Sequence, residues 1–142
     1  MRIVRFLPQH LQELRLQPAQ SSFRAALLKP EYGTALALAG PCFTVLVDDK
    51  PIACAGAQEF HAGRAEIWAL IGRDAGPYMR PMTRAAIGWF DQCSYRRLEV
   101  NVATHFEPGH RWARMLGFQV EGPEKLAYSP DGRSAISYVR LK

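Results

Sequence analysis

The pattern of apolar and polar positions is most informative between residues 64 and 90. Residues 65–71 form a short apolar run rich in β-branched and aromatic side chains, which favours a strand covered on much of both faces. Gly72 and the turn residues after it end this strand, and from Met79 apolar positions recur at helical spacing. A strand that leads through a glycine-containing turn into a helix brings free backbone N–H groups to the positive end of the helix dipole. The segment therefore predicts either an anion-binding site or a plain strand-to-helix connection.

Similar patterns divide the rest of the chain. Strands are predicted at residues 2–7, 42–47, 52–60, 65–71, 97–102, 119–128 and 135–141. Helices are predicted at residues 9–16, 21–29, 79–93 and 107–116, the last of them ending at Gly117. Residues 31–40 alternate alanine and leucine and fit either a helix or a strand, so their structure is left open.

The order of these elements constrains the sheet. Strands 42–47, 52–60 and 65–71 follow one another through short turns, as in an antiparallel meander. Because a helix connects strand 65–71 to strand 97–102, these two strands should run parallel. The last two strands are joined by a Pro-Asp-Gly turn, which is typical of a hairpin. We expect one α/β (α+β) domain over residues 1–142, with a twisted, mostly antiparallel sheet of about seven strands flanked by about four helices.

Composition and charge narrow the classes of function only slightly. The chain has 142 residues, 48% of them hydrophobic, which suffices for one sizeable core without disulfides or metals. No apolar run approaches the ~20 residues of a membrane span, and the N-terminal residues lack the pattern of a signal peptide, so neither membrane insertion nor export is expected. The net charge of +5, with arginines concentrated after Gly72, suits a phosphate-rich ligand, a nucleic acid or an ordinary surface. Nucleic acid is the minor possibility, because the aromatic residues do not interleave with the basic ones.

The cysteines point to a reducing compartment. Cys42, Cys54 and Cys93 are odd in number, widely spaced and set among apolar neighbours, as expected of reduced packing residues in a cytoplasmic protein. No pair of them has the short spacing of a zinc site, and the histidines are not arranged with them as ligands. We therefore expect no metal.

Two local motifs, together with the order of elements, carry a family resemblance over nearly the whole chain. RDAGPY at residues 73–78 is similar to the Arg/Gln-x-x-Gly-x-Gly/Ala loop of the GNAT superfamily of acyltransferases, and WARMLGF at 112–118 is similar to that family's helix ending in Leu-Gly-Phe. The resemblance implies that the parallel strand pair is splayed at the centre of the sheet. GHRWARMLGF and the hairpin AYSPDGRSAISYVRL look most like short acetyltransferase-like proteins of tailed bacteriophages.

The resemblance implies an N-acetyltransferase that uses acetyl-coenzyme A. The acceptor would be a primary amine of a small molecule, a modified nucleobase or a protein, and the enzyme would act as a monomer or homodimer, in the host cytoplasm if it is phage-encoded. In the family, amides of the turn and of the following helix start hold the pyrophosphate, and the pantetheine arm lies between the splayed strands. The matching cofactor-binding residues are Ala69, Leu70, Ile71, Arg73, Gly76, Tyr78, Arg80 and Asn101.

The resemblance also proposes catalytic residues. A carboxylate on the central strands would deprotonate the amine through water, and Glu66 or Glu59 could serve. The family's frequent acid, a tyrosine shortly before Leu-Gly-Phe, is replaced here by Ala113. Protonation of the leaving thiolate could then fall to Tyr78, His105 or His110, since an imidazole or a phenol can donate a proton. The candidate catalytic set is Glu66, Tyr78 and His105.

Three departures from the family pattern support a second hypothesis. Pro77 has no N–H to donate, and one lost charge-assisted hydrogen bond weakens binding by on the order of tenfold to a hundredfold. Tyr78 puts a bulky ring where the family has glycine or alanine, and Ala113 removes the usual acid. The alternative is therefore a GNAT-like protein without catalysis, acting as a binding or phage virion-assembly protein.

Overall fold

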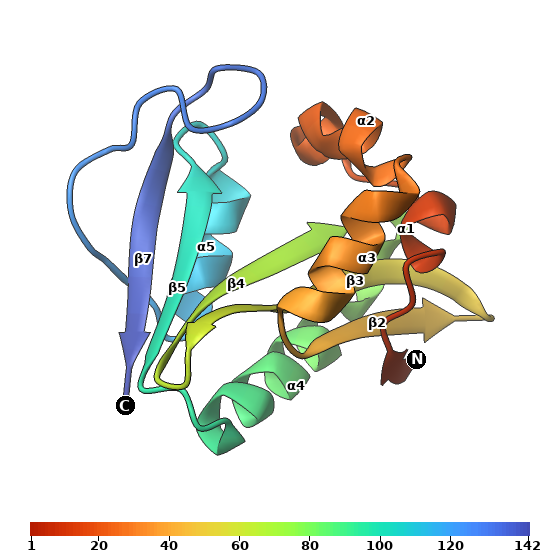
Figure 1. Ribbon diagram of the computed structural model, residues 1–142, viewed down its shortest axis with the longest axis horizontal. Helices are drawn as coiled ribbons and strands as arrows, with labels where there is room; N and C mark the ends of the chain where they lie inside the picture. The colour runs from red at the N-terminus through yellow and green to blue at the C-terminus, as the bar shows by residue number, and fades with distance from the viewer. The chain divides into compact units, whose positions relative to one another are not determined.

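A computed structural model describes all residues, 1–142, and contains seven strands, five α-helices and two 3-10 helices (Figure 1). The strands are β1 (Arg2–Arg5), β2 (Cys42–Val47), β3 (Lys50–His61), β4 (Arg64–Ile71), β5 (Arg97–Ala103), β6 (Gln119–Val120) and β7 (Ala135–Leu141). The α-helices are α1 (His10–Glu13), α2 (Arg24–Leu27), α3 (Pro30–Ala39), α4 (Met79–Gln92) and α5 (Glu107–Met115), and the 3-10 helices are η1 (Pro18–Phe23) and η2 (Arg73–Tyr78).

The strands form one sheet in the order β1-β2-β3-β4-β5-β7-β6, in which β4 and β5 are parallel. This confirms the predicted mixed, mostly antiparallel sheet. The chain divides into two compact units: the first comprises residues 1–59 and 67–79, and the second comprises residues 60–66 and 80–142. Strands β3 and β4 therefore contribute residues to both units.

The first unit is built around leucines of its short helices. A buried cluster joins these leucines to apolar residues of the chain ends and strands: Phe6, Leu11, Leu14, Leu16, Leu27, Cys54 and Leu70. Trp68 of β4 packs edge-to-face on Phe6, with ring centroids 5.8 Å apart. Helix α3 crosses the face of β2 and β3 that is turned to the viewer in Figure 1. The apolar side of β4 is thereby fixed toward this core.

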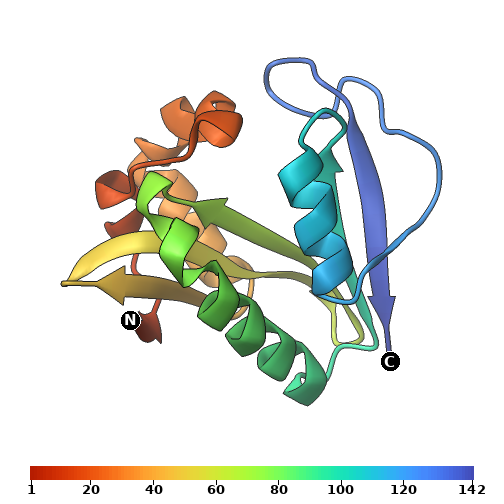
Figure 2. The ribbon, with the colours of Figure 1, turned by 180° about the vertical axis from the view of Figure 1, so that it is seen from behind.

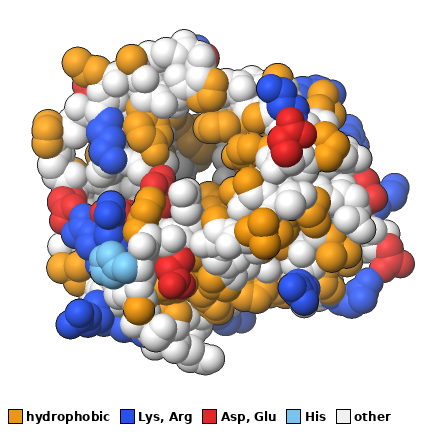
Figure 3. Space-filling view, in the orientation of Figure 1, with side chains coloured by type: hydrophobic (Ala, Val, Ile, Leu, Met, Phe, Trp, Pro, Cys, Tyr) orange, Lys and Arg blue, Asp and Glu red, His pale blue; other side chains and the backbone are white.

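The second unit pairs β5 with β7 along seven residues, from Arg97↔Leu141 to Ala103↔Ala135. Helix α5 lies against β5 on the side turned to the viewer in Figure 2. Trp112 of α5 donates from Nε1 to Thr83 Oγ1 of α4 at 2.8 Å, so the two helices are linked directly. Leu98 and Tyr138, both 2% exposed, fill the space between strands and helices. Charged side chains gather over the opposite side of this unit in Figure 3.

The end of α5 confirms the predicted terminal glycine. Gly117 has a φ of +89°, which is the left-handed conformation that favours glycine. Its amide bonds to the Arg114 carbonyl at 3.0 Å, and the Phe118 amide bonds to the Ala113 carbonyl at 3.0 Å. The helix therefore stops here, and Phe118 turns into the core, where it is 3% exposed.

Four sequence predictions needed correction or completion. The helix predicted at 9–16 is only the single-turn α1, because the chain is extended at Leu14 and Leu16 forms a bridge with Gly72. The strand predicted at 119–128 is wrong beyond Val120: Gly122 takes a φ of +83° and Pro123 has no N–H, so the regular pairing with β7 is interrupted and resumes only as an isolated bridge between Lys125 and Ala135. The helix predicted at 21–29 is instead η1 followed by the single-turn α2. The undecided residues 31–40 form α3, with Pro30 in its first turn and the strong helix formers alanine and leucine over its last five residues.

None of the helices combines the length and the apolar character that crossing a lipid bilayer requires.

Candidate functional site

The end of β4 is held on both of its edges, and a glycine makes this possible. Gly72 donates its amide to the Ile52 carbonyl of β3 at 2.8 Å and forms an isolated antiparallel bridge with Leu16. A Cβ at Gly72 would lie 2.7 Å from the Ile52 oxygen, so a side chain does not fit. Arg73 continues the bridge, because its amide bonds to the Arg15 carbonyl at 2.8 Å. The strand thus enters η2 in a fixed direction.

The predicted anion-binding motif forms η2, directly before α4. The Arg73 amide is bonded to the Arg15 carbonyl, and its Nε donates to the Leu16 carbonyl at 3.1 Å. The residue is otherwise exposed. The Ala75 amide bonds to the Gly72 carbonyl at 3.2 Å, and Pro77 has no N–H to offer. Some of the backbone amides that the resemblance assigned to the pyrophosphate are therefore already hydrogen-bonded to carbonyls of this chain.

Gly76 is the feature of this motif that fits a ligand. A Cβ built on Gly76 would have no atom within 4 Å, and its backbone does not take a positive φ. Neither packing nor conformation therefore requires a glycine at this position. The space beside its backbone is what the close approach of a phosphate requires. The backbone of Gly76 is therefore accessible, although this turn offers fewer amide donors than the motif suggested.

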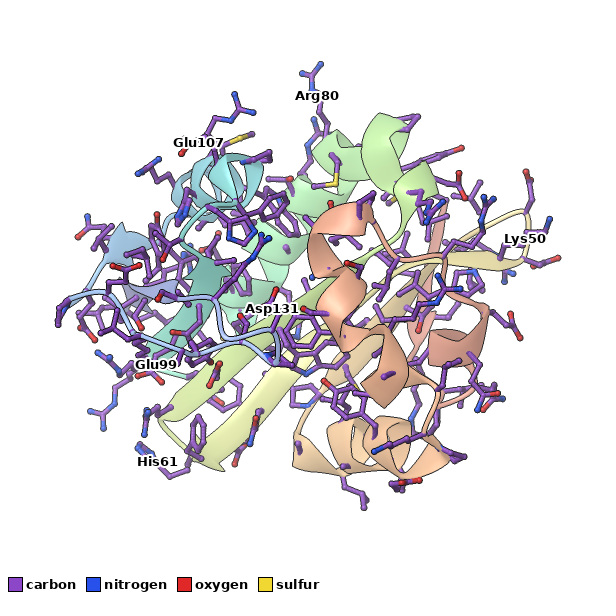
Figure 4. All side chains as sticks on the ribbon, turned by 90° about the horizontal axis from the view of Figure 1, so that it is seen from above. Lys50, His61, Arg80, Glu99, Glu107 and Asp131 are labelled. Carbon is purple, nitrogen blue, oxygen red and sulfur yellow. The ribbon has the colours of Figure 1, made fainter.

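Tyr78 and Arg80, which the resemblance also assigned to cofactor binding, differ from each other in exposure. Tyr78 is the last residue of η2 and is half-buried. Arg80, in the first turn of α4, is exposed, and its side chain projects away from the ribbon (Figure 4). Arg80 is therefore available to an anionic ligand, whereas the ring of Tyr78 is partly enclosed by protein.

The edge of β4 that does not face β3 is covered by a side chain. Backbone groups of successive strand residues point to opposite edges of the strand. Because Gly72 bonds to β3, the backbone groups of Ala69 and Ile71 point to the other edge. This is the edge that pairs with β5 nearer the start of β4. Gln20 of η1 donates from Nε2 to the Ala69 carbonyl at 2.7 Å, and its Oε1 accepts from the Ile71 amide at 2.8 Å. Leu70, between them, directs its backbone groups toward β3.

Glu66, three residues earlier on β4, belongs to a network of side chains in the second unit. Its Oε1 accepts a hydrogen bond from Asn101 Nδ2 at 2.9 Å and one from the Tyr128 hydroxyl at 3.2 Å. Asn101 Oδ1 in turn accepts from Ser137 Oγ at 2.7 Å and from Lys125 Nζ at 3.1 Å. The structure thus brings together Glu66 and Asn101, which the sequence proposed separately.

Strand pairing explains why this network forms. The parallel ladder between β4 and β5 ends at Glu66↔Glu99, although both strands continue beyond it. Asn101 lies two residues past Glu99 on the same face of β5, and it pairs with Ser137 of β7. Glu66, Asn101 and Ser137 therefore present polar side chains on one face of three adjacent strands.

Glu99, on the same face, is held by two arginines. Arg64 Nε donates to its Oε2 at 2.9 Å, and Arg97 Nε donates to its Oε1 at 2.9 Å. Burial alone would raise the pKa of the Glu99 carboxyl, but the hydrogen bonds and charges of Arg64 and Arg97 outweigh it and hold this pKa below its ordinary value. Glu99 is therefore a fixed anion engaged in ion pairs.

Tyr128 is the residue of this network that sequence reasoning missed. Burial, followed by the negative charge of Glu66 and the hydrogen bond to it, raises the pKa of the Tyr128 hydroxyl to about 12. The phenol therefore stays protonated at neutral pH. Tyr128 and Lys125 lie between β6 and β7, in a segment that the hydrophobic pattern assigned to a strand, and no motif marks either of them. Only their contacts identify them.

The two candidate histidines are engaged in other contacts. Arg133 Nη1 lies 2.6 Å from His105 Nε2; because the arginine can only donate, Nε2 accepts and carries no proton that an acid could give to the thiolate. His110 is 6% exposed; its Nε2–H donates to the Thr104 carbonyl at 3.0 Å, and its Nδ1 bonds to the Tyr138 hydroxyl at 2.7 Å. His110 thus ties the start of α5 to β7.

The remaining two residues from the resemblance lie outside this network. Ala113, at the position of the family's usual tyrosine, is 3% exposed and belongs to the core side of α5. Glu59 is an exposed residue of β3, in the first unit. Of the two carboxylates proposed as a base, Glu66 is the one bonded to Asn101 and Tyr128.

Comparison with solved structures identifies the fold. Ard1 from Thermoplasma volcanium matches with a TM-score of 0.79 and 13% identity, covering 99% of this chain and 96% of that chain. Ribosomal-protein-alanine N-acetyltransferase from Brucella melitensis matches with a TM-score of 0.73 and 10% identity over 100% of both chains. An acetyltransferase of the GNAT family from Streptococcus pneumoniae matches with a TM-score of 0.71 and 16% identity, over 99% and 98%.

No protein-family model and no curated protein sequence matches this chain. The chain therefore has the GNAT fold that its sequence predicted, and its relationship to these acetyltransferases is one of structure at low identity. The resemblance to bacteriophage proteins and the cytoplasmic location stay predictions.

Proposed function

We propose that this protein is an N-acetyltransferase that moves an acetyl group from acetyl-coenzyme A to a primary amine of a small molecule, a modified nucleobase or a protein. The observation that carries the proposal is Glu66, a carboxylate at the end of the β4–β5 ladder that is oriented by Asn101 and bonded to the neutral Tyr128. The GNAT fold and the open space at Gly76 support it.

Acetyl transfer needs a base and an acid. The amine must lose a proton, a bond must form between its nitrogen and the acetyl carbon, the carbon–sulfur bond must break, and the thiolate must gain a proton. We assign the base to Glu66 and the acid to Tyr128, whose pKa of about 12 keeps it protonated at neutral pH. The proton that Glu66 takes from the amine passes to Tyr128 through their hydrogen bond, so the network returns to its starting state.

Binding of the acyl donor is assigned to the end of β4 and to the residues after it. Gly76 would admit the pyrophosphate, and the exposed Arg73 and Arg80 would supply positive charge to its phosphates. The charge of these arginines would make up in part for the donor that Pro77 lacks. The thioester of acetyl-coenzyme A supplies the activated acetyl group, and the residues of this chain supply position and proton transfer.

The first experiment is calorimetric titration of the purified protein with acetyl-coenzyme A, followed by an assay of free thiol released in the presence of a broad panel of amines. We expect micromolar binding and amine-dependent thiol release. A protein that neither binds acetyl-coenzyme A nor releases thiol with any amine does not have the proposed function.

Three glutamate variants test the role of Glu66. Glu66→Gln keeps the shape of the side chain but removes the base, and should lower kcat by roughly 10²–10⁴-fold. Glu59→Gln tests the rival carboxylate, and Glu107→Gln, at the exposed start of α5 (Figure 4), is the matched control. Loss of activity in Glu59→Gln but not in Glu66→Gln would move the base to β3.

A further inference from the structure

The hydrogen bonds of Gln20 follow the pattern of a parallel β-strand. In a parallel pair, one residue of a strand donates its N–H to the carbonyl of residue i on its neighbour and accepts from the N–H of residue i+2. Gln20 makes this pair of bonds with its side-chain amide: Nε2 donates to Ala69 O at 2.7 Å, and Oε1 accepts from Ile71 N at 2.8 Å. Its primary amide therefore takes the place of one peptide group of an added strand.

The segment that carries Gln20 is fixed independently of this side chain. The Gln17 amide donates to the Ile71 carbonyl at 2.9 Å, and Leu16 forms a bridge with Gly72. Gln17 Nε2 also donates to Gln20 Oε1 at 3.1 Å, which orients the Gln20 amide. Because the chain just before η1 is anchored to the end of β4 through backbone groups, rotation of the Gln20 side chain alone would free the Ala69 carbonyl and the Ile71 amide. Gln20 is half-buried, so such a rotation has solvent to move into.

We propose that Gln20 occupies, in the free protein, the backbone groups of β4 that bind a secondary amide of the pantetheine arm, and that it sets the affinity for coenzyme A by competing for them. The proposal rests on the proposed function, since it takes acetyl-coenzyme A as the ligand. Pantetheine is an extended chain with secondary amides, each of which can donate to a carbonyl and accept from an amide as Gln20 does. Ligand and side chain therefore make the same bonds and exclude each other.

The competition predicts an unusual effect: removal of a polar residue tightens binding of the ligand. Each intramolecular hydrogen bond of this kind shifts an equilibrium severalfold in favour of the bonded state, and Gln20 makes two of them. Gln20→Met approximately keeps the volume of the side chain and removes both bonds to β4, together with the bond from Gln17 Nε2. We expect this variant to bind coenzyme A roughly tenfold more tightly than the natural protein.

The test is calorimetric titration of the natural protein, Gln20→Met and Gln12→Met with two probes. Gln12 is exposed on α1 and serves as the matched control. The probes are coenzyme A and 3′-phospho-ADP, which keeps the pyrophosphate but lacks the arm. Support requires that Gln20→Met tightens binding of coenzyme A alone, whereas Gln12→Met changes neither probe.

The remaining outcomes are distinguishable from one another. Equal affinity of the natural protein and Gln20→Met for coenzyme A overturns the competition and leaves the proposed function intact. Weaker binding of both probes by Gln20→Met shows that Gln20 supports the shape of the site, and also overturns it. Absence of binding by every protein rejects the proposed function, and the competition with it.

Amide hydrogen exchange at Ile71 gives a readout that does not depend on catalysis. In the free natural protein the Gln20 side chain should slow exchange of this amide, whereas in free Gln20→Met exchange should be faster. Coenzyme A should restore protection in the variant. An Ile71 amide that exchanges equally in both free proteins contradicts the proposed role of Gln20.

Discussion

Strand β4 presents two kinds of binding group within six residues. At Glu66, in the second unit, the functional group is a carboxylate held by the side chains of Asn101 and Tyr128. At Ala69 and Ile71, in the first unit, the functional groups are backbone carbonyl and amide, and the only side chain involved belongs to the covering residue Gln20. One half of the strand therefore works through residue identity and the other through backbone geometry.

This difference determines how each half responds to substitution. A side-chain network loses its chemistry when one member is changed, because a base or an acid has no replacement in the backbone. The N–H and C=O groups at the edge of a strand are present whatever the side chain, except in proline, which has no N–H. Their availability therefore changes only when a covering group changes or when the path of the backbone changes. Single substitutions should therefore affect catalysis in the second unit, and affinity or folding in the first.

After Glu66→Gln, the largest effect should come from Tyr128→Phe. The variant removes the proposed proton donor to the leaving thiolate while keeping the ring, and kcat should fall by roughly 10²-fold or more. The measurement is thiol release at saturating acetyl-coenzyme A and amine. Tyr78→Phe is the rival variant, since the resemblance proposed Tyr78 as the acid. If Tyr78→Phe shows the larger loss in kcat, the acid lies in η2 and not in the side-chain network.

A change of backbone path should have the next largest effect. In Gly72→Ala the new methyl would lie 2.7 Å from the Ile52 carbonyl, so β4 must shift and the free energy of unfolding should fall by about 1–3 kcal/mol. Gly76→Ala meets no atom within 4 Å and should leave this free energy unchanged or raise it slightly. Urea denaturation of both variants measures the difference. Equal destabilisation by the two variants would mean that Gly76 has a structural role.

Asn101→Leu tests whether the network is also a source of stability. The substitution leaves Glu66, Lys125 and Ser137 without a shared partner, which should lower the free energy of unfolding by about 1–2 kcal/mol. Ser137→Ala removes one of these bonds and should cost less. Chemical denaturation of the two variants and the natural protein gives the comparison. If Asn101→Leu is as stable as the natural protein, the network contributes to function alone.

The smallest effect concerns pH. Because Arg64 and Arg97 outweigh burial and hold the pKa of Glu99 below its ordinary 4.5, the folded protein binds this proton less readily than the unfolded chain does. The stabilisation is therefore present above about pH 4.5 and is lost as the pH falls through the lower, folded-state value. Glu99→Gln should be less stable than the natural protein at neutral pH by less than about 1 kcal/mol. This gap should narrow in acid, and a gap that widens there would contradict the assignment.

The order of strands and helices was readable from the sequence because most elements have a clear period. The run 65–71, the helix after Met79 and the glycine at the end of α5 were predicted from local patterns and confirmed. The strand prediction at 119–128 was wrong beyond Val120 because the apolar residues of this segment resemble a strand, whereas Gly122 and Pro123 interrupt the pairing with β7 and leave only an isolated bridge at Lys125. Residues 31–40 stayed open because an alternation of alanine and leucine fits two periods, and packing on β2 and β3 decides for α3.

The candidate site was predicted only in part, for a different reason. Glu66 and Asn101 were proposed because each sits on a strand that the resemblance marks, and the structure adds that they are bonded to each other. Tyr128 and Gln20 carry no motif: the first comes from an irregular segment, and the second acts through contacts with backbone groups. Gln20 lies 51 positions from Ile71, and Tyr128 lies 62 positions from Glu66. Contacts over such separations leave no local pattern in a single sequence.

The sequence by itself determined the fold class, the parallel pair of strands, and the glycines that end β4 and α5. These follow from periodicity, turn chemistry and the handedness of connections, all of which act over short distances along the chain. Tertiary structure decided which polar groups meet: that Tyr128 faces Glu66, that Arg133 engages His105, and that Gln20 covers the edge of β4. Hydrogen bonds depend on positions within a fraction of an ångström, and only the folded chain fixes those positions.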